Sequence, residues 1–256
     1  MKTRIEAKKL SYYINKKPIL KDINLCLDEG KFYGVLGPNG SGKTTLLDLL
    51  LGLIDKSSGD VLIDGISLES IKRNNLAQII ALVPQNFNIT FPYKVQEILE
   101  MGRYPFKKRL RGLSSYDYDI IEAAKKSFNL YALDKKDITS LSGGEKQRIA
   151  FAKAIIQSTP VIFLDEATSN MDPYYAHFAL NEVKKSIKDN KKTVISVFHD
   201  MNLAARYCDE IILLKDGNIL DKGKTQNVLT TENIKKLFGI ESICVSQNGK
   251  NYIIPA

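Results

Sequence analysis

A glycine-rich segment that ends in lysine and threonine is the first part of the sequence with the residue types and spacing for chemistry. Residues 37–44 read GPNGSGKT and match the pattern G-x-x-x-x-G-K-[ST], between an expected strand at 32–36 and an expected helix at 44–53. In that setting the backbone N–H groups and the positive end of the helix bind phosphate oxygens. Lys43 would place a charge near the β- and γ-phosphates, and the Thr44 hydroxyl would ligate Mg²⁺. The loop predicts a nucleotide-phosphate site, which many classes of enzyme share.

Two adjacent carboxylates follow a second apolar run. Residues 161–164 read VIFL and lead directly into Asp165 and Glu166, at the end of a strand where α/β sheets place their ligands. Asp165 would hold Mg²⁺ directly or through water, and Glu166 would accept a proton from an attacking water. The alternative is an acidic pair at the exposed end of a strand. Beside a phosphate loop, the catalytic interpretation is favoured.

Between these two motifs lies a helix start that contains two glycines. Residues 141–148 read LSGGEKQR, and Ser142 and Glu145 have the S-x-x-E spacing of a capping box. An ordinary helix start would explain that spacing. Two glycines in a first turn nevertheless weaken the helix and expose N–H groups at its positive end, which predicts a second anion site.

Short apolar runs and helical segments alternate along the chain and must position these motifs. The runs at 161–164, 194–198 and 211–214 are bounded by polar or turn residues, as expected of strands buried on both faces of a parallel sheet. Further strands are expected at 19–20, 23–27, 32–36, 61–63 and 79–83, and helices at 44–53, 95–101, 118–130 and 149–156. Asp172 and Pro173 predict the N-cap and first position of another helix. The pattern is that of an α/β fold with a helical insertion.

Composition excludes several classes of protein. The 256 residues carry 37 Lys and Arg against 29 Asp and Glu, a net charge of +8, with 44% hydrophobic residues. Three cysteines without a CxxC pair argue against a disulfide scaffold, and no apolar run approaches the roughly 20 residues of a membrane span. No apolar segment of a secretory signal follows the N-terminus, so a location inside the cell is expected. The positive charge leaves nucleic acid, an acidic membrane surface and a polyanionic ligand open.

The motifs together resemble the nucleotide-binding subunit of ATP-binding-cassette (ABC) transporters over nearly the whole chain. LSGGEKQR at 141–148 is similar to the signature motif of that family. Gln85 matches its Q-loop glutamine, residues 169–172 its D-loop and His199 its switch histidine, in the family's order. The resemblance implies a P-loop NTPase core with a mainly parallel sheet, an N-terminal antiparallel β subdomain and an inserted α-helical subdomain. It implies a single domain over 1–256, with the helical insert at about 86–158.

The resemblance also implies a set of site residues. Glu166, His199 and Gln85 are expected to be catalytic, and Thr44, Gln85 and Asp165 to hold Mg²⁺. The adenine-stacking residue is Tyr13 by a small register shift, with Tyr12 and Ile14 as the alternatives. The residues expected to contact ATP are Gly37, Pro38, Asn39, Gly40, Ser41, Gly42, Lys43, Thr44, Thr45, Tyr13, Ser142, Gly143, Gly144, Gln147 and Asp172. In the family, ATP lies between the phosphate loop of one subunit and the signature helix of a second copy.

Residues 76–85 and 95–105 resemble the importer ATPases for iron-siderophore, haem and cobalamin uptake. Zinc and manganese importer ATPases are similar here and remain an alternative. By the same resemblance the partners are transmembrane permease subunits, a second copy and, indirectly, an external solute-binding protein, with no nucleic acid. The expected location is peripheral, on the cytoplasmic face of the cell membrane. Phe87, Phe91 and Tyr93 would contact the permease or close the core of the helical insert.

A soluble cassette ATPase acting on ribosomes or DNA is the rival class, for which a basic chain would be apt. Ribosome-acting members carry two cassettes and DNA-repair members a long coiled coil. This chain has one copy of each motif and only about a hundred residues between Lys43 and Ser142. A nucleotide-binding regulator without catalysis is disfavoured, because every polar catalytic position is occupied.

Overall fold

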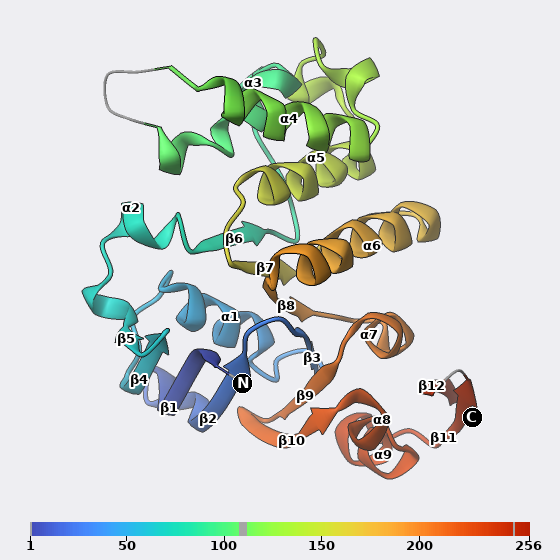
Figure 1. Cartoon of the computed structure of the whole chain (residues 1–256). Coiled ribbons are helices and arrows are strands. Elements are labelled where there is room, and N and C mark those ends of the chain that lie inside the picture. Colours follow the sequence, from blue (N-terminus) through green and yellow to red (C-terminus); the bar gives the residue numbers. More distant parts are fainter. Residues whose placement is uncertain (1, 108–111, 248) are drawn as a thin grey trace. The chain divides into compact units, whose positions relative to one another are not determined.

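The computed structural model describes residues 2–107, 112–247 and 249–256 and divides into two units (Figure 1). The first unit combines both ends of the chain, Met1–Ile71 and Thr193–Ala256, and the second is Lys72–Lys192. Among the described residues, no helix has the length and apolarity that a membrane span requires.

An antiparallel sheet in the first unit has the strand order β2-β1-β4-β5. Its strands are β1 (Thr3–Ile14), β2 (Lys17–Asp28), β4 (Ser58–Ile63) and β5 (Ile66–Ser67). The two short strands predicted at 19–20 and 23–27 are one strand, and β1 was not predicted. The polar interruption at Asp22 is a local kink with φ of 48°, where its N–H donates to Ser11 Oγ at 2.9 Å. The strand therefore continues through the polar residues that had suggested a break.

A second sheet of this unit carries the strand that leads to the phosphate loop. Here β3 (Phe32–Leu36) pairs in parallel with both β8 (Thr193–Val197) and β9 (Glu210–Lys215), and β9 pairs antiparallel with β10 (Asn218–Lys224). Every residue of β3 and β8 is buried. The prediction of strands buried on both faces is confirmed for β8 and for residues 211–214 of β9, and the bounds of β3 are those predicted.

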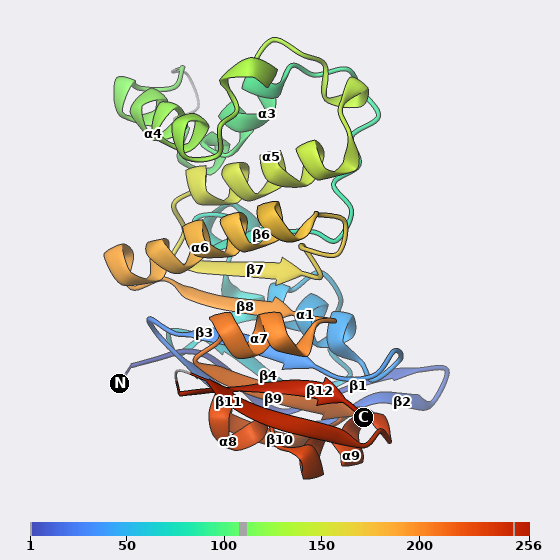
Figure 2. The same cartoon turned by 90° about the vertical axis from the view of Figure 1, so that its right-hand side faces the viewer.

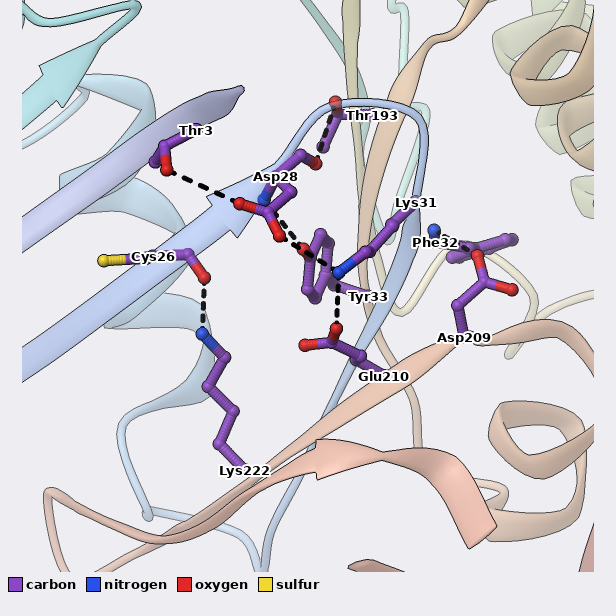
Figure 3. A network of polar contacts seen from close by, with 10 residues as sticks. All are labelled: Thr3, Cys26, Asp28, Lys31, Phe32, Tyr33, Thr193, Asp209, Glu210 and Lys222. Atoms are coloured by element: carbon purple, nitrogen blue, oxygen red, sulfur yellow. Dashed lines mark hydrogen bonds and ion pairs between the residues drawn. The ribbon is translucent and has the colours of Figure 1, made fainter. Parts of the chain in front are cut away.

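A polar network fixes the start of β3 (Figure 3). The Lys31 ammonium contacts Asp28 Oδ2 at 3.0 Å and Glu210 Oε1 at 2.7 Å, and its pKa is raised chiefly by the hydrogen bond to Glu210. Phe32 N–H donates to Asp209 Oδ2 at 2.8 Å. The Asp28 N–H donates to the Tyr33 hydroxyl oxygen, and burial raises the pKa of Tyr33 to about 12. These hydrogen bonds and ion pairs join the end of β2 to the start of β3 and to the start of β9.

The helices of the first unit are α1 (Lys43–Leu51), α7 (Met201–Tyr207), α8 (Thr225–Val228) and α9 (Thr231–Phe238), with a 3₁₀ turn η1 at Leu68–Ser70. Helix α1 ends two residues earlier than predicted, because Gly52 adopts φ of 66° and its N–H bonds to the carbonyls of Asp48 and Leu49. A terminal ribbon of β11 (Ser242–Gln247) and β12 (Lys250–Pro255) packs on α7, where Asn202 exchanges two hydrogen bonds with the backbone of Ile253 (Figure 2).

The second unit is mainly helical and contains the parallel strand pair β6 (Ile80–Val83) and β7 (Val161–Asp165). Its helices are α2 (Arg73–Leu76), α3 (Val95–Met101), α4 (Ser115–Ser127), α5 (Gly143–Ile156) and α6 (Pro173–Asn190), with 3₁₀ turns η2 (Tyr104–Phe106), η3 (Tyr131–Leu133) and η4 (Ile138–Ser140). Helix α3 has the predicted bounds. Helix α4 begins three residues before the predicted start, at the Ser114 cap that the sequence analysis had not used.

Two buried cations hold these helices together. Arg103, after α3, donates to Asp117 Oδ1 on α4 at 2.7 Å and to the Ile156 carbonyl of α5 at 3.0 Å. Lys125 on α4 contacts Gln96 of α3 at 3.1 Å and Asp134 at 2.6 Å. Because Arg103 and Lys125 are themselves buried, loss of a partner would leave a costly unpaired charge. Figures 1 and 2 both place α5 between α4 and α6.

Candidate nucleotide-binding site

The predicted phosphate loop connects β3 to α1, and two of its glycines are required by their surroundings. A Cβ on Gly37 would lie 2.2 Å from the Leu214 carbonyl oxygen and 2.6 Å from Ser41 Oγ. Gly42 adopts φ of 100°, which disfavours any residue with a side chain. The loop is therefore held close against the end of β9, as a tight phosphate cradle requires.

The lysine of the loop lies beneath this cradle. Lys43 is only 5% exposed, and its ammonium donates to the carbonyls of Gly37 at 2.9 Å and Pro38 at 3.1 Å. The Ser41 hydroxyl oxygen is buried without a hydrogen-bond partner among the described residues. Thr44, Asn39 and Gly40 are exposed and Thr45 is half-buried. A buried cation beside an unsatisfied donor is an arrangement that a phosphate group would complete.

Replacement of Gly37 by alanine is expected to distort the loop and lower ATP affinity at least about tenfold, with a loss of stability of about 1–3 kcal/mol from the backbone clash. Gly223→Ala is a matched control, because a Cβ there meets Val228 Cγ2 at 3.5 Å, an ordinary contact. Nucleotide titration and thermal unfolding of both variants would check this. Equal affinity in Gly37→Ala and the parent would contradict the prediction.

The two carboxylates of the second unit lie at the carboxyl end of β7, as predicted. Asp165 is the last residue of the strand, and Glu166 follows it in the left-handed region with φ of 45°. Such a conformation is disfavoured for glutamate, and it occurs in turns as well as at functional sites. Gln85 Nε2 donates to Glu166 Oε2 at 2.6 Å, so the structure brings these two predicted residues together.

Asn170 is a residue of this region that the sequence analysis did not place in the site. Its amide nitrogen donates to the Gln85 carbonyl at 3.3 Å and to Asn86 Oδ1 at 3.1 Å. It therefore connects the segment after β7 to the segment after β6. No local pattern in the sequence pairs residues 85 positions apart, although Asn170 falls within the four-residue segment already singled out at 169–172.

The predicted capping box at the start of α5 is confirmed. Ser142 Oγ accepts from the Glu145 N–H at 3.3 Å, and Glu145 Oε2 accepts from the Ser142 N–H at 2.9 Å, a contact that chiefly lowers the pKa of Glu145. Ser142 and Gly143 are exposed, Gly144 is half-buried, and a Cβ on Gly143 would meet only open space. A side chain at position 143 would fit without a clash, so packing does not require a glycine there. The missing side chain would allow another molecule to approach the backbone closely at this exposed helix start.

Gln147, predicted to contact the nucleotide, is buried and its amide donates to the Pro84 carbonyl at 2.8 Å. In this structure it joins α5 to the segment that carries Gln85. Asp172 caps α6 as predicted, because its Oδ1 accepts from the Tyr175 N–H at 3.1 Å. A contact of either residue with ATP stays a prediction.

His199 is exposed immediately after β8, where the chain turns into α7. The following Asp200 caps α7 by accepting from the N–H groups of Asn202 at 2.7 Å and Leu203 at 3.1 Å. Tyr13 and Ile14, at the end of β1, are 47% and 48% exposed, and Tyr12 is half-buried. Exposure therefore does not choose among the three candidates for adenine stacking. The predicted site residues are divided between the units, with the phosphate loop, Tyr13 and His199 on the first.

The family model described as ABC transporter matches residues 20–169. The chain is 38% identical to a hemin import ATP-binding protein of Pseudomonas fluorescens over 243 residues, 93% of each chain. It is 36% identical to a cobalamin import ATP-binding protein of Halobacterium salinarum over 220 residues, which are 86% of this chain but 55% of that relative. The chain thus spans little more than half the length of the cobalamin relative.

Solved structures show the same fold. A structure described as a metal-chelate type ABC transporter in an inward-facing conformation matches all of this chain and 98% of its own, with a TM-score of 0.84 and 30% identity. A dimeric ATP-binding cassette bound to ADP and phosphate after hydrolysis covers 86% of this chain and 98% of its own, with a TM-score of 0.74 and 30% identity. The predicted fold class, a P-loop ATPase core with an antiparallel β part and helical elements, is confirmed.

Proposed function

This chain belongs to the ABC transporter family, and from that premise we propose that it binds and hydrolyses ATP to energise a membrane importer. The observation that carries the proposal is the phosphate loop, where Lys43 is buried beside the unsatisfied hydroxyl of Ser41. The test is ATP hydrolysis by the purified chain with and without Mg²⁺. A chain that binds ATP but never hydrolyses it, alone or with its permease, would be a regulator instead.

In the proposed reaction the phosphate loop binds the β- and γ-phosphates through its N–H groups, the Lys43 ammonium and the start of α1. Glu166 accepts the proton of the attacking water, while Gln85 holds the Glu166 carboxylate through the 2.6 Å hydrogen bond. His199 would orient the water against the γ-phosphate.

Thr44, Gln85 and Asp165 are proposed as ligands of Mg²⁺. A hydroxyl, an amide oxygen and a carboxylate are the oxygen donors that this cation prefers, and Gln85 uses its nitrogen for Glu166, which leaves the oxygen of its amide for the metal. When bound, Mg²⁺ would neutralise charge on the β- and γ-phosphate oxygens. The metal dependence of hydrolysis tests this assignment.

We propose a second copy of the chain as a partner, with its Ser142, Gly143 and Gly144 against the ATP held by the first copy. The exposed start of α5 supports this, and the dimeric cassette among the similar structures is a precedent. The chain would work as a single domain over 1–256, with a helical insert at about 86–158. Light scattering with and without ATP would detect the dimer.

We propose iron-siderophore, haem or cobalamin as the class of solute, because the similar proteins named above are hemin and cobalamin import proteins. A zinc or manganese importer is the alternative. Transport with the matching permease and solute-binding protein would decide between them. An affinity for nucleic acid that falls steeply with salt would instead revive the ribosome or DNA class.

The permease is proposed to contact Phe91 from the cytoplasmic side of the membrane. Phe91 is 61% exposed and its ring lies 4.7 Å from that of Tyr93, so Phe91 itself does not close the core of the second unit. Aromatic side chains are enriched at protein interfaces, which supports a partner contact at this pair.

Phe91→Asp is expected to leave ATP binding intact and to abolish co-purification with the permease and transport, because a charge would enter an apolar contact. Tyr118→Asp is the control, since Tyr118 is another exposed aromatic residue, at 44%, and belongs to α4 rather than to the segment of Phe91. Unchanged co-purification and transport in Phe91→Asp would contradict the assignment.

A further inference from the structure

The second unit contains a cavity that the proposed function does not use. It has a volume of about 530 Å³ and lies where α4 and the end of α5 meet the C-terminal half of α6. This volume is in the range of small-molecule sites. None of the residues predicted to bind ATP or metal lines it, so the cavity is separate from the proposed ATP site.

One wall of the cavity carries a buried cation. Lys192 is 5% exposed, and its ammonium has neither a hydrogen bond nor an ion pair with the residues that the structure describes. Burial lowers the pKa of Lys192 to about 8, so the ammonium is still mostly protonated at pH 7. An unpaired buried charge is costly unless a partner neutralises it. The cavity therefore contains a cation whose partner is not supplied by the described part of the chain.

The rest of the lining is mixed in polarity. Six of the other thirteen residues are apolar, and the polar ones include Ser127, Ser158, Thr159 and Asn190. Ile120 and Ala123 of α4, Phe128 directly after it and Ile155 of α5 line the cavity. The hydroxyl of Ser186 also lines it and is committed to the Val183 carbonyl. Glu182 is the one carboxylate of the lining, and it is paired with Lys185. One positive charge without a partner among the described residues thus shares the cavity with an apolar wall formed by α4, Phe128 and α5.

We propose that this cavity binds a small amphipathic monocarboxylate, whose carboxylate pairs with Lys192 and whose hydrocarbon part lies against Ile120, Phe128 and Ile155. A single ammonium matches one carboxylate, whereas a nucleotide or polyphosphate would need several cations or a phosphate loop. The apolar wall of Ile120, Phe128 and Ile155 favours a ligand with a hydrocarbon chain or ring over a fully hydrated anion. The site is independent of ATP hydrolysis.

Octanoate is a suitable probe, and its binding to the purified chain at pH 7 can be followed by calorimetry. We expect saturable binding with one site per chain. Lys192→Met should weaken it at least tenfold, because methionine keeps the length of the side chain and removes the charge. The adjacent Lys191→Met is the matched control, since Lys191 is exposed and absent from the lining. Equal affinity in the parent and Lys192→Met, or no saturable binding in the millimolar range, would overturn the proposal.

The pH dependence provides a second test on the unmodified chain. Tyr116, Glu182 and Lys192 are the titratable residues of the lining, and burial lowers the pKa of Lys192 to about 8. Octanoate affinity should change little between pH 6 and pH 7, where the probe is ionised, and fall about tenfold by pH 9, as the ammonium of the free protein loses its proton. A flat profile would argue against pairing with Lys192.

Ala123→Leu tests whether octanoate binds inside the cavity without changing the charge of the lining. It also provides a test if Lys192→Met does not fold. The added side chain would occupy the apolar part of the cavity while Lys192 stays in place. Octanoate binding should weaken at least tenfold, with an unchanged response to ATP. Full octanoate affinity in this variant would place the ligand elsewhere and overturn the proposal.

Discussion

Glu166→Gln is expected to bind ATP with unchanged affinity and to hydrolyse it about 10²–10⁴-fold more slowly than the parent chain, the range for removal of a positioned general base. Glutamine has the shape of glutamate but cannot accept the proton of the attacking water. Its side-chain oxygen can still accept from Gln85 Nε2, the contact that spans 2.6 Å in the parent. The loop geometry should therefore persist, and the loss should fall on the rate of the chemical step.

Single-turnover hydrolysis and equilibrium ATP binding measure the two quantities separately. A slow variant should also accumulate as an ATP-bound dimer, because hydrolysis is the proposed step that reopens the dimer. Glu232→Gln is the control, since Glu232 is exposed on α9 and pairs only with Lys236 among the described residues. Substantial residual turnover in Glu166→Gln would show that another group is the base.

The elements around the site could be predicted where apolar runs have sharp polar boundaries. β3 and α3 have the predicted bounds, and the caps at Ser142 and Asp172 form as their side-chain chemistry indicated. Each of these features depends on interactions within a few residues. Such local interactions are encoded in short windows of sequence.

The features that were missed depend on partners distant in the sequence. Strand β1 has a weak apolar pattern, and it is a strand because it pairs with both β2 and β4. The Asn170 contact with Gln85 and the Gln147 contact with Pro84 likewise join segments 85 and 63 residues apart. Tertiary context decides such contacts, so propensity and spacing do not identify them.

The net charge of +8 has a different meaning once the structure is considered. Three cations are buried at separate places. Arg103 and Lys125 contact carboxylates in the second unit. Lys43 lies beneath the phosphate loop and donates to the Gly37 carbonyl. Helix α6 shows the surface alternative, because Lys185 and Lys188 are exposed while its apolar face is buried. Local placement of charge, rather than the total, therefore supports a phosphate ligand.

Lys43→Met should reduce ATP affinity about 10- to 100-fold, because it removes a charge-assisted contact to the phosphates. Lys43 is only 5% exposed, and methionine fills the same space without a buried charge. The stability of the nucleotide-free chain should therefore be unchanged or increased. This opposite behaviour of stability and affinity distinguishes a ligand-binding lysine from a structural one.

Thermal unfolding with and without ATP measures both effects in one experiment. At an ATP concentration about 100 times the dissociation constant, the parent gains about 2.7 kcal/mol, and a 100-fold weaker variant would gain only about 0.4 kcal/mol. Lys21→Met, at an exposed position of β2, is the control and should keep the full gain. If Lys43→Met keeps the full gain, the ammonium serves the loop through its bonds to Gly37 and Pro38 and makes no net contribution to ATP binding.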